Sequence, residues 1–266
     1  MARTSELRSL LITATLTGIL LFLPGVSSTA QTAAKPGRTP VLVELFTSEG
    51  CSSCPPADAL LAKFYREQPI DSADIIVLEE HVDYWDQLGW HDRFSSHQYT
   101  ERQNRYSSRF NLNDVYTPQM VVDGSEQFVG NDAAQAHRAI AHSATQSPKV
   151  ALSLSMPMLD GHHVSATISA GTQSSLPKAD LYAALVDPFA TTDVRNGENG
   201  GRRLQHVSVV RSLQRIGNLQ DLAPGPVKFN ISAPDNTVPG DMRLIVFAQR
   251  AGQGPVLGVA AIPTKQ

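Results

Sequence analysis

The two cysteines of the chain lie directly after a hydrophobic run. Cys51 and Cys54 are the only cysteines, and they form a C-x-x-C motif that follows the apolar residues 41–46. A strand that ends in such a motif and continues into a helix directs the N–H groups of the helix N-terminus at the first sulfur, which stabilises a thiolate there. The motif therefore predicts redox chemistry carried by an α/β framework.

The N-terminal segment predicts export. A basic start is followed by an apolar stretch over residues 10–23 and by small residues that end at Ala30, an order typical of a signal peptide. We expect a signal peptide over residues 1–30 and a flexible leader over residues 31–39. A signal anchor is the alternative, but the apolar stretch is short for a bilayer. We expect a periplasmic or secreted protein with no membrane insertion after cleavage.

Residues 40–147 alternate predicted strands and helices, which indicates an α/β domain. Strands are expected over residues 41–46 and 75–78, and helices over residues 57–67, 95–110 and 132–143. The helix over residues 95–110 is interpreted as an insertion. Asp123 and Gly124 separate two further strands, at residues 119–122 and 127–129, and this pair is typical of a hairpin turn.

Residues 148–266 show another pattern, in which short runs of alternating apolar and polar residues are separated by turn residues. Seven strands are expected, at residues 150–154, 164–168, 180–186, 206–213, 227–231, 242–249 and 256–262. This spacing favours an all-β, sandwich-like C-terminal domain. His162, His163 and His206 have no acidic or cysteine cluster beside them in the sequence, and we interpret them as surface or strand-face histidines.

Glu44 is unusual because it is a carboxylate inside an otherwise apolar strand. Such a group must find a partner or hold a proton, unless it reaches solvent at a strand edge. For the cysteines, sulfur chemistry assigns mixed-disulfide formation to Cys51 and resolution to Cys54, which we expect to be the more buried sulfur. Ser52 and Ser53 are uncharged and do not set the direction of transfer.

An aromatic segment follows the second predicted strand and contains His81, Tyr84, Trp85 and Trp90. At the C-terminal edge of the sheet these side chains would lie near the dithiol and could contact a substrate. His81 could act as a base or as a soft-metal ligand beside the cysteines. Alternatively, the aromatics cap the core and His81 makes a satisfied hydrogen bond. One C-x-x-C motif with one histidine leaves a metal site short of donors, so we expect neither a metal nor a cofactor.

Four segments together carry a family resemblance, namely residues 41–58, 81–85, 116–124 and 195–199. On these motifs the chain resembles DUF1223, a family of exported bacterial proteins with a thioredoxin-like domain joined to a β-rich domain. The resemblance implies a cis peptide bond before Pro118, placed against the dithiol, with the Thr117 backbone offered to an incoming peptide or thiol. It also implies that Glu44 relays a proton to Cys54. An ordinary turn proline is the alternative for Pro118.

The sequence thus predicts an exported thiol-disulfide oxidoreductase that acts on a protein or on a small thiol or disulfide. Two alternatives remain. One is a periplasmic copper-binding chaperone that uses Cys51, Cys54 and His81, and the other is an interaction protein in which the C-x-x-C disulfide is purely structural. The net charge of −3 gives no electrostatic footprint for nucleic acid, and we expect no such partner.

Overall fold

The computed structural model describes residues 37–146, 149–172 and 175–263. The predicted signal peptide and all of the leader before residue 37 lie outside the described residues. Within the described ranges, no helix is long and apolar enough to cross a membrane.

The N-terminal half contains the predicted alternation of strands and helices. Its elements are β1 (Thr39–Thr47), α1 (Pro55–Glu67), β2 (Ala73–His81), α2 (His97–Arg109), β3 (Gln119–Val122), β4 (Glu126–Val129) and α3 (Ala133–Thr145). Each of the three helices begins at residues that favour a helix N-terminus. Pro55 and Pro56 occupy the first turn of α1, where the missing N–H groups cost nothing. Ser96 caps α2 and Asp132 caps α3, each through a side-chain oxygen that accepts a backbone N–H.

The C-terminal half consists of strands, with short 3₁₀ turns at Leu219–Leu222 and Pro239–Asp241. The strands are β5 (Leu152–Leu154), β6 (Met158–Asp160), β7 (His163–Ala170), β8 (Asp180–Asp193), β9 (Arg203–Asn218), β10 (Val227–Ser232), β11 (Arg243–Gln249) and β12 (Val256–Pro263). The seven predicted strands are confirmed. The sequence did not predict β6, and it predicted only about half the length of β8 and β9, which pair with each other over almost their whole length.

One mixed sheet contains strands from both halves of the chain. Its order in the described residues is β12-β11-β8-β9-β2-β1-β3-β4. β1 and β2 are parallel, and β3 and β4 form the expected hairpin. Between β2 and β9, the described ladder consists of the pair Glu79 and Val209. The protein is thus a mixed α/β structure. Its large sheet contains strands from before and after residue 147, where the sequence pattern changes.

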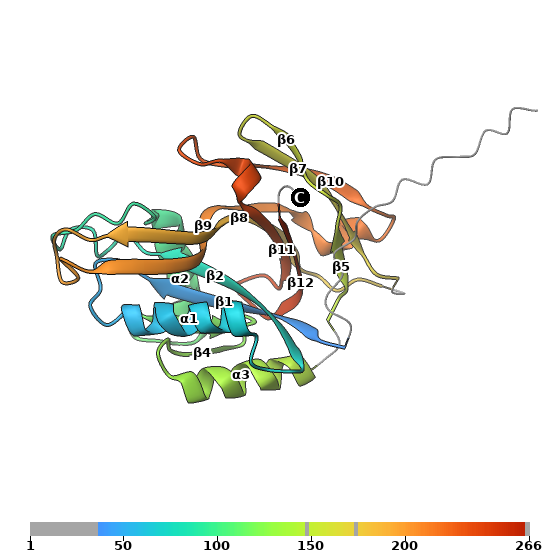
Figure 1. Cartoon of the computed structure of the whole chain (residues 1–266). Coiled ribbons are helices and arrows are strands. Elements are labelled where there is room, and N and C mark those ends of the chain that lie inside the picture. Colours follow the sequence, from blue (N-terminus) through green and yellow to red (C-terminus); the bar gives the residue numbers. More distant parts are fainter. Residues whose placement is uncertain (1–36, 147–148, 173–174, 264–266) are drawn as a thin grey trace, which may run out of the picture.

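Helices cover the N-terminal part of this sheet on both faces. α1 and α3 pack on the face that carries Val43 and Leu45, and α2 packs on the face that carries Leu42 and Phe46. A second sheet, of order β10-β7-β5 with β6 paired to β7, packs against β8 and β11 through an apolar core. The long β8–β9 hairpin extends beside α1 (Figure 1).

Candidate functional site

The cysteines form a disulfide at the junction of β1 and α1. Cys51 and Cys54 are bonded, with Cα atoms 5.4 Å apart. Both residues are 0% exposed, whereas Ser52 between them is exposed. The expectation that Cys54 is the more buried of the two is therefore wrong, because other parts of the chain bury Cys51 as completely.

The cover over Cys51 comes from the loop between β8 and β9, which we call the covering loop (residues 194–202). Asn199 Nδ2 donates hydrogen bonds to the carbonyl oxygens of Glu49 and Cys51, each at 2.9 Å. Glu198 Oε2 accepts a hydrogen bond from the Ser52 backbone at 3.0 Å. Hydrogen bonding to the side chain and then the backbone of Ser52 lowers the pKa of the exposed Glu198 carboxyl. Residues about 150 positions away in the sequence thus bind the C-x-x-C segment directly.

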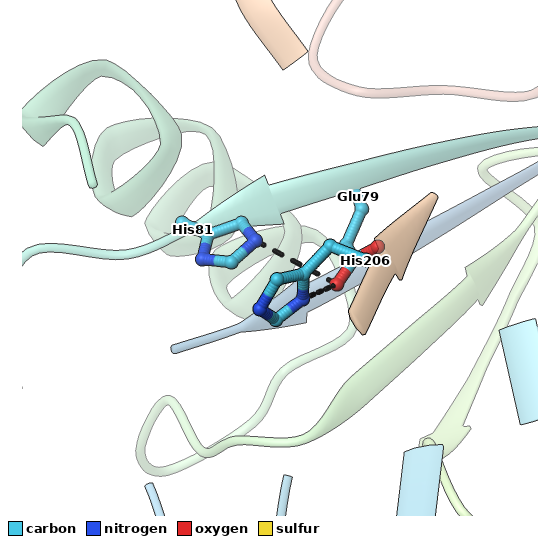
Figure 2. A group of neighbouring side chains, drawn as sticks. All are labelled: Glu79, His81 and His206. Atoms are coloured by element: carbon cyan, nitrogen blue, oxygen red, sulfur yellow. Dashed lines mark hydrogen bonds and ion pairs between the residues drawn. The ribbon is translucent and has the colours of Figure 1, made fainter. Parts of the chain in front are cut away.

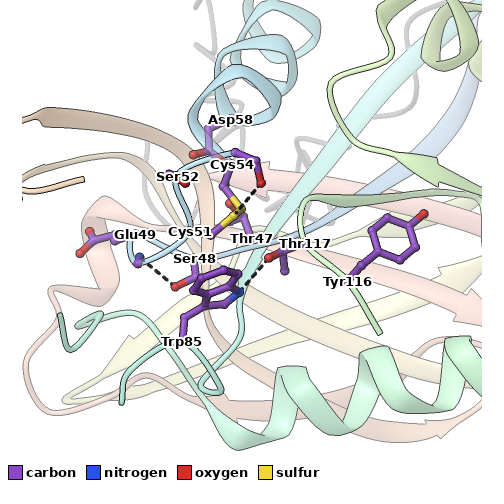
Figure 3. The surroundings of a disulfide bond; sticks show 12 residues. Thr47, Ser48, Glu49, Cys51, Ser52, Cys54, Asp58, Trp85, Tyr116 and Thr117 are labelled. Carbon is purple, nitrogen blue, oxygen red and sulfur yellow. Dashed lines mark hydrogen bonds between the residues drawn. A yellow bond between two sulfur atoms is a disulfide. The ribbon is translucent and has the colours of Figure 1, made fainter. Parts of the chain in front are cut away.

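Trp85 connects the C-x-x-C segment to the Thr117–Pro118 peptide. The Trp85 indole Nε1 donates to Thr117 Oγ1 at 2.8 Å, and both residues surround the disulfide (Figure 3). A Cβ added at Gly50 would lie 3.1 Å from Trp85 Cβ, a tight contact that would require Trp85 to shift. The peptide bond before Pro118 is cis, as the family resemblance implies. The structure therefore brings Trp85 and Thr117 to the cysteines.

Tyr84 and Trp90 bond to different partners. Tyr84 donates its hydroxyl hydrogen to Gln103 of α2 at 3.2 Å, and burial raises its pKa to about 12. Trp90 Nε1 donates to Glu49 Oε2 at 2.7 Å. Trp90 thereby contacts the residue two positions before Cys51, whereas Tyr84 contacts the inserted helix.

Glu44 is buried and lies on the opposite face of β1 from α1. Arg102 Nε and Tyr106 Oη of α2 donate to its carboxylate at 2.6 and 2.5 Å. Side chains alternate along a strand, so Thr47, and not Glu44, faces α1. The sequence left open whether Glu44 is buried with a partner or reaches solvent at a strand edge. In the structure it is buried, and its charged partner is Arg102 of α2.

Asp58 is a buried carboxyl group beside the disulfide that sequence reasoning did not single out. It lies in the first turn of α1, its backbone N–H donates to the Cys54 carbonyl at 3.1 Å, and Thr47 Oγ1 donates to its carboxyl at 2.7 Å (Figure 3). Burial, reinforced by the charge of Glu79, raises its pKa from 3.8 to about 7. A pKa near neutrality suits a group that exchanges protons. Its place four residues after Cys54, on the α1 face turned to the sheet, was a usable sequence signal.

His81 is not bonded to the cysteines but belongs to a buried cluster with Glu79 and His206 (Figure 2). His81 Nδ1 lies 2.6 Å from Asp92 Oδ2, and His206 Nδ1 lies 2.6 Å from Glu79 Oε1. His206 is 1% exposed, so it is not a surface histidine. We call Glu79, His81 and His206 the histidine cluster.

Charge pairing dominates the protonation of this cluster. Burial alone would lower the pKa of both histidines, but Asp92 raises the pKa of His81 well above 6.5, and Glu79 raises the pKa of His206. Burial would raise the pKa of both carboxyls, yet the same histidines hold the pKa of Glu79 and Asp92 at about 2. A cleft of about 470 Å³ between α1 and the β8–β9 hairpin is lined by both Asp58 and His206.

The fold and this geometry define a mixed α/β protein with a covered C-x-x-C disulfide. The family model for DUF1223, "Protein of unknown function", matches residues 42–249, and the chain belongs to this family. Among solved structures, a protein from Agrobacterium tumefaciens is 28% identical with a TM-score of 0.66, and the match covers 86% of this chain and 96% of that one. A domain of the outer membrane lipoprotein Omp28 from Porphyromonas gingivalis is 11% identical with a TM-score of 0.31, over 45% and 91% of the two chains. No curated protein matches.

Proposed function

We propose that the protein is an exported thiol-disulfide oxidoreductase that reacts through Cys51 and Cys54. The observation that carries the proposal is the disulfide itself, which closes the C-x-x-C motif at the start of α1. The N–H groups of a helix N-terminus stabilise a thiolate at this position once the bond is reduced. Export follows from the predicted signal peptide over residues 1–30, and the expected substrate is a protein or a small thiol or disulfide.

The arrangement of the N-terminal half supports a thioredoxin-like domain. Four strands in the order β2-β1-β3-β4, with α1 and α3 on one face and α2 on the other, correspond to the core of that fold. The C-x-x-C motif then lies where thioredoxin-like proteins carry their dithiol. We assign the strands after residue 147 to a β-rich, sandwich-like unit whose β8–β9 hairpin covers the motif.

The exchange step assigns different tasks to the two sulfurs. A thiolate of the substrate attacks Cys51 Sγ and forms a mixed disulfide, while the bond between the cysteines breaks and Cys54 leaves as a thiolate. Asp58, with a pKa of about 7, supplies the proton that Cys54 takes up. In the reverse direction Asp58 accepts that proton before Cys54 attacks the mixed disulfide. Because both sulfurs are buried, the covering loop has to move before either reaction.

A structural disulfide is the competing function, and the full burial of both cysteines favours it. The copper chaperone of the sequence interpretation has less support, because the free nitrogen of His81 faces Glu79 and His81 is not bonded to the cysteines.

The reduction potential of the Cys51–Cys54 pair separates exchange from a structural role. We would equilibrate the mature protein with glutathione and dithiothreitol buffers, using Cys51→Ser and Cys54→Ser variants as controls. A potential between about −270 and −120 mV, the range of known exchange catalysts, is the expected result. A potential below about −300 mV is typical of structural disulfides and would overturn the proposal.

A further inference from the structure

Two clefts beside α1 share Arg66 and Phe189 in their walls. The first is the cleft of about 470 Å³ between α1 and the β8–β9 hairpin, and it begins directly after the C-x-x-C motif, at Pro55. The second has a volume of about 600 Å³, lies at the C-terminal end of α1 and is also lined by Arg243. Because the clefts meet at Arg66 and Phe189, we call them together the α1 groove.

The length of the α1 groove fits an extended polypeptide. Pro55 and Arg66 lie eleven residues apart in α1, which corresponds to about 16 Å at about 1.5 Å for each helical residue. An extended chain advances about 3.3 Å per residue, so the same distance accommodates roughly five residues of a bound segment. A small thiol would fill only part of this length. The shape therefore favours a segment of a protein as the ligand.

The charges along the α1 groove favour an acidic ligand. Although the whole chain has a net charge of −3, the walls of the groove carry three arginines, namely Arg66, Arg203 and Arg243. The carboxyl groups among the described lining residues are Asp58 and Asp74. Asp58 is buried with its pKa raised to about 7, so it is only partly ionised at neutral pH. Arg203 also lies 3.9 Å from Asp193, but both side chains are exposed, where such a pair is weak. The groove therefore has a surplus of positive charge that attracts carboxylates.

Phe189 gives the α1 groove an apolar contact where the two clefts meet. Its side chain is 63% exposed, and its ring packs edge-on against Tyr65 of α1, with the ring centroids 5.5 Å apart. The Arg243 guanidinium lies 5.6 Å from the centroid of the Tyr65 ring. Aromatic and arginine side chains are the residue types enriched where proteins bind one another. An exposed aromatic ring that a neighbour already holds in place can contact an apolar side chain of a bound segment.

We propose that the α1 groove binds an extended, acidic segment of a substrate protein. The proposal rests on the oxidoreductase function, because it names the class of substrate on which Cys51 and Cys54 act.

The position of the groove relates binding to exchange. Since the groove begins at Pro55, a cysteine at the near end of a bound segment is held beside the C-x-x-C motif. The β8–β9 hairpin forms the wall opposite α1 and also carries the covering loop. A bound segment therefore contacts the same hairpin whose loop has to move before the disulfide reacts.

Peptide binding tests the groove without any thiol chemistry. A Cys51→Ser, Cys54→Ser double variant of the mature protein is titrated into a fluorescein-labelled peptide of seven residues, a serine followed by alternating glutamate and valine, and the anisotropy is recorded. A second peptide has glutamine in place of each glutamate. We expect the acidic peptide to bind about fivefold more tightly at low salt, the combined effect of two or three exposed ion pairs. This preference should shrink at about 0.5 M salt. Equal affinities of the two peptides at low salt would overturn the proposal.

Substitutions in the same cysteine-free protein locate the segment. Arg66→Gln and Arg203→Gln should each reduce the preference for the acidic peptide by about twofold, the effect of one exposed ion pair. Phe189→Ala should weaken the binding of both peptides alike. Lys228→Gln removes a positive charge from an exposed residue of β10 and is the matched control, which should bind like its parent. An undiminished preference after both arginines are replaced would overturn the assignment of the ligand to this groove.

Exchange with the wild-type protein separates failure of the groove from failure of the proposed function. The disulfide is reduced with dithiothreitol or with cysteine versions of the two peptides, where two peptide thiols become one peptide disulfide and the protein gains two thiols. Each peptide rate is divided by the rate of the same peptide with a small-molecule disulfide, because neighbouring glutamates also change the pKa of a thiol. The acidic peptide should then react about fivefold faster. Reduction by dithiothreitol with equal rates for the two peptides would overturn the acidic segment and leave the oxidoreductase function standing. A reduction potential typical of a structural disulfide would overturn that function, and with it the role of the segment as substrate, whereas the anisotropy result would still report on binding.

Discussion

Replacing Asn199 by alanine should expose the disulfide to reductants. The Asn199 side chain donates two buried hydrogen bonds, to the carbonyls of Glu49 and Cys51. At a net value of about 1 kcal/mol for each bond, the closed covering loop loses about 2 kcal/mol of stability relative to the open one. Since about 1.4 kcal/mol corresponds to a factor of ten, the open population should rise roughly 30-fold.

The rate of reduction by dithiothreitol reports on that population. If the reductant reacts only with the open form, the rate at low dithiothreitol concentration should rise by the same factor of roughly 30. Free thiols are trapped with an alkylating reagent at intervals and counted by mass spectrometry. Asn230→Ala, which changes an exposed residue of β10, is the matched control and should reduce at the wild-type rate.

Global unfolding could also expose the cysteines, and low concentrations of urea distinguish the two routes. Opening of one loop exposes little surface, so its rate should depend only weakly on urea, whereas unfolding has a steep dependence. An Asn199→Ala protein that is reduced at the wild-type rate would refute the assignment of residues 194–202 as the cover. A faster reduction with a steep urea dependence would also refute it.

Three further outcomes follow from the buried groups around the site. Asp58 has a folded pKa raised to about 7, so its contribution to stability is complete below pH 4 and is lost as the pH rises through 7. Between pH 5 and pH 8, the unfolding free energy of Asp58→Asn, measured by urea unfolding, should rise by on the order of 2–3 kcal/mol relative to that of the wild type. If the unfolding free energies of the two proteins run parallel over this pH range, Asp58 is not a buried acid with a raised pKa. Arg102→Met leaves the Glu44 carboxylate buried without its cation and should cost about 3–5 kcal/mol, with the reduction potential of the cysteines unchanged. An altered potential would mean that Glu44 does act on the dithiol. Trp85→Phe removes the indole hydrogen bond to Thr117 and should lower the unfolding free energy by about 1 kcal/mol; an unchanged urea midpoint would show that this bond contributes nothing.

The sequence predicted the individual elements well because periodicity and turn residues are local signals. The strands and helices that were predicted, and the hairpin at Asp123, lie where these signals placed them, although β6 and about half of β8 and β9 were missed. Strand partners are not local, so the pairing of β2 with β9 and the resulting eight-stranded sheet had no counterpart in the pattern. For the same reason His206 looked isolated in the sequence. Its partner Glu79 lies 127 positions away along the chain.

The proton relay at Glu44 was implied by the family resemblance, and the alternation of side chains along β1 shows which face of the sheet this carboxylate occupies. A carboxylate in β1 faces α1 or α2 according to its parity, and Glu44 has the parity of Leu42 and Phe46, which face α2. Arg102 could be recognised as its partner only after α2 was placed on that face. On the α1 face, Asp58 is the buried carboxyl that meets Thr47.

Glu49 is the residue at which the cover, the disulfide and the histidine cluster meet. Its carbonyl accepts from Asn199, its N–H donates to Asp92, and its carboxylate accepts from Trp90. Only the first of these bonds involves the covering loop. When that loop moves aside, Asp92 and Trp90 still hold the residue that precedes Gly50 and Cys51. Asp92 and Trp90 therefore hold the backbone on the approach to Cys51. The opening of the covering loop that the proposed exchange requires would leave that backbone in its position.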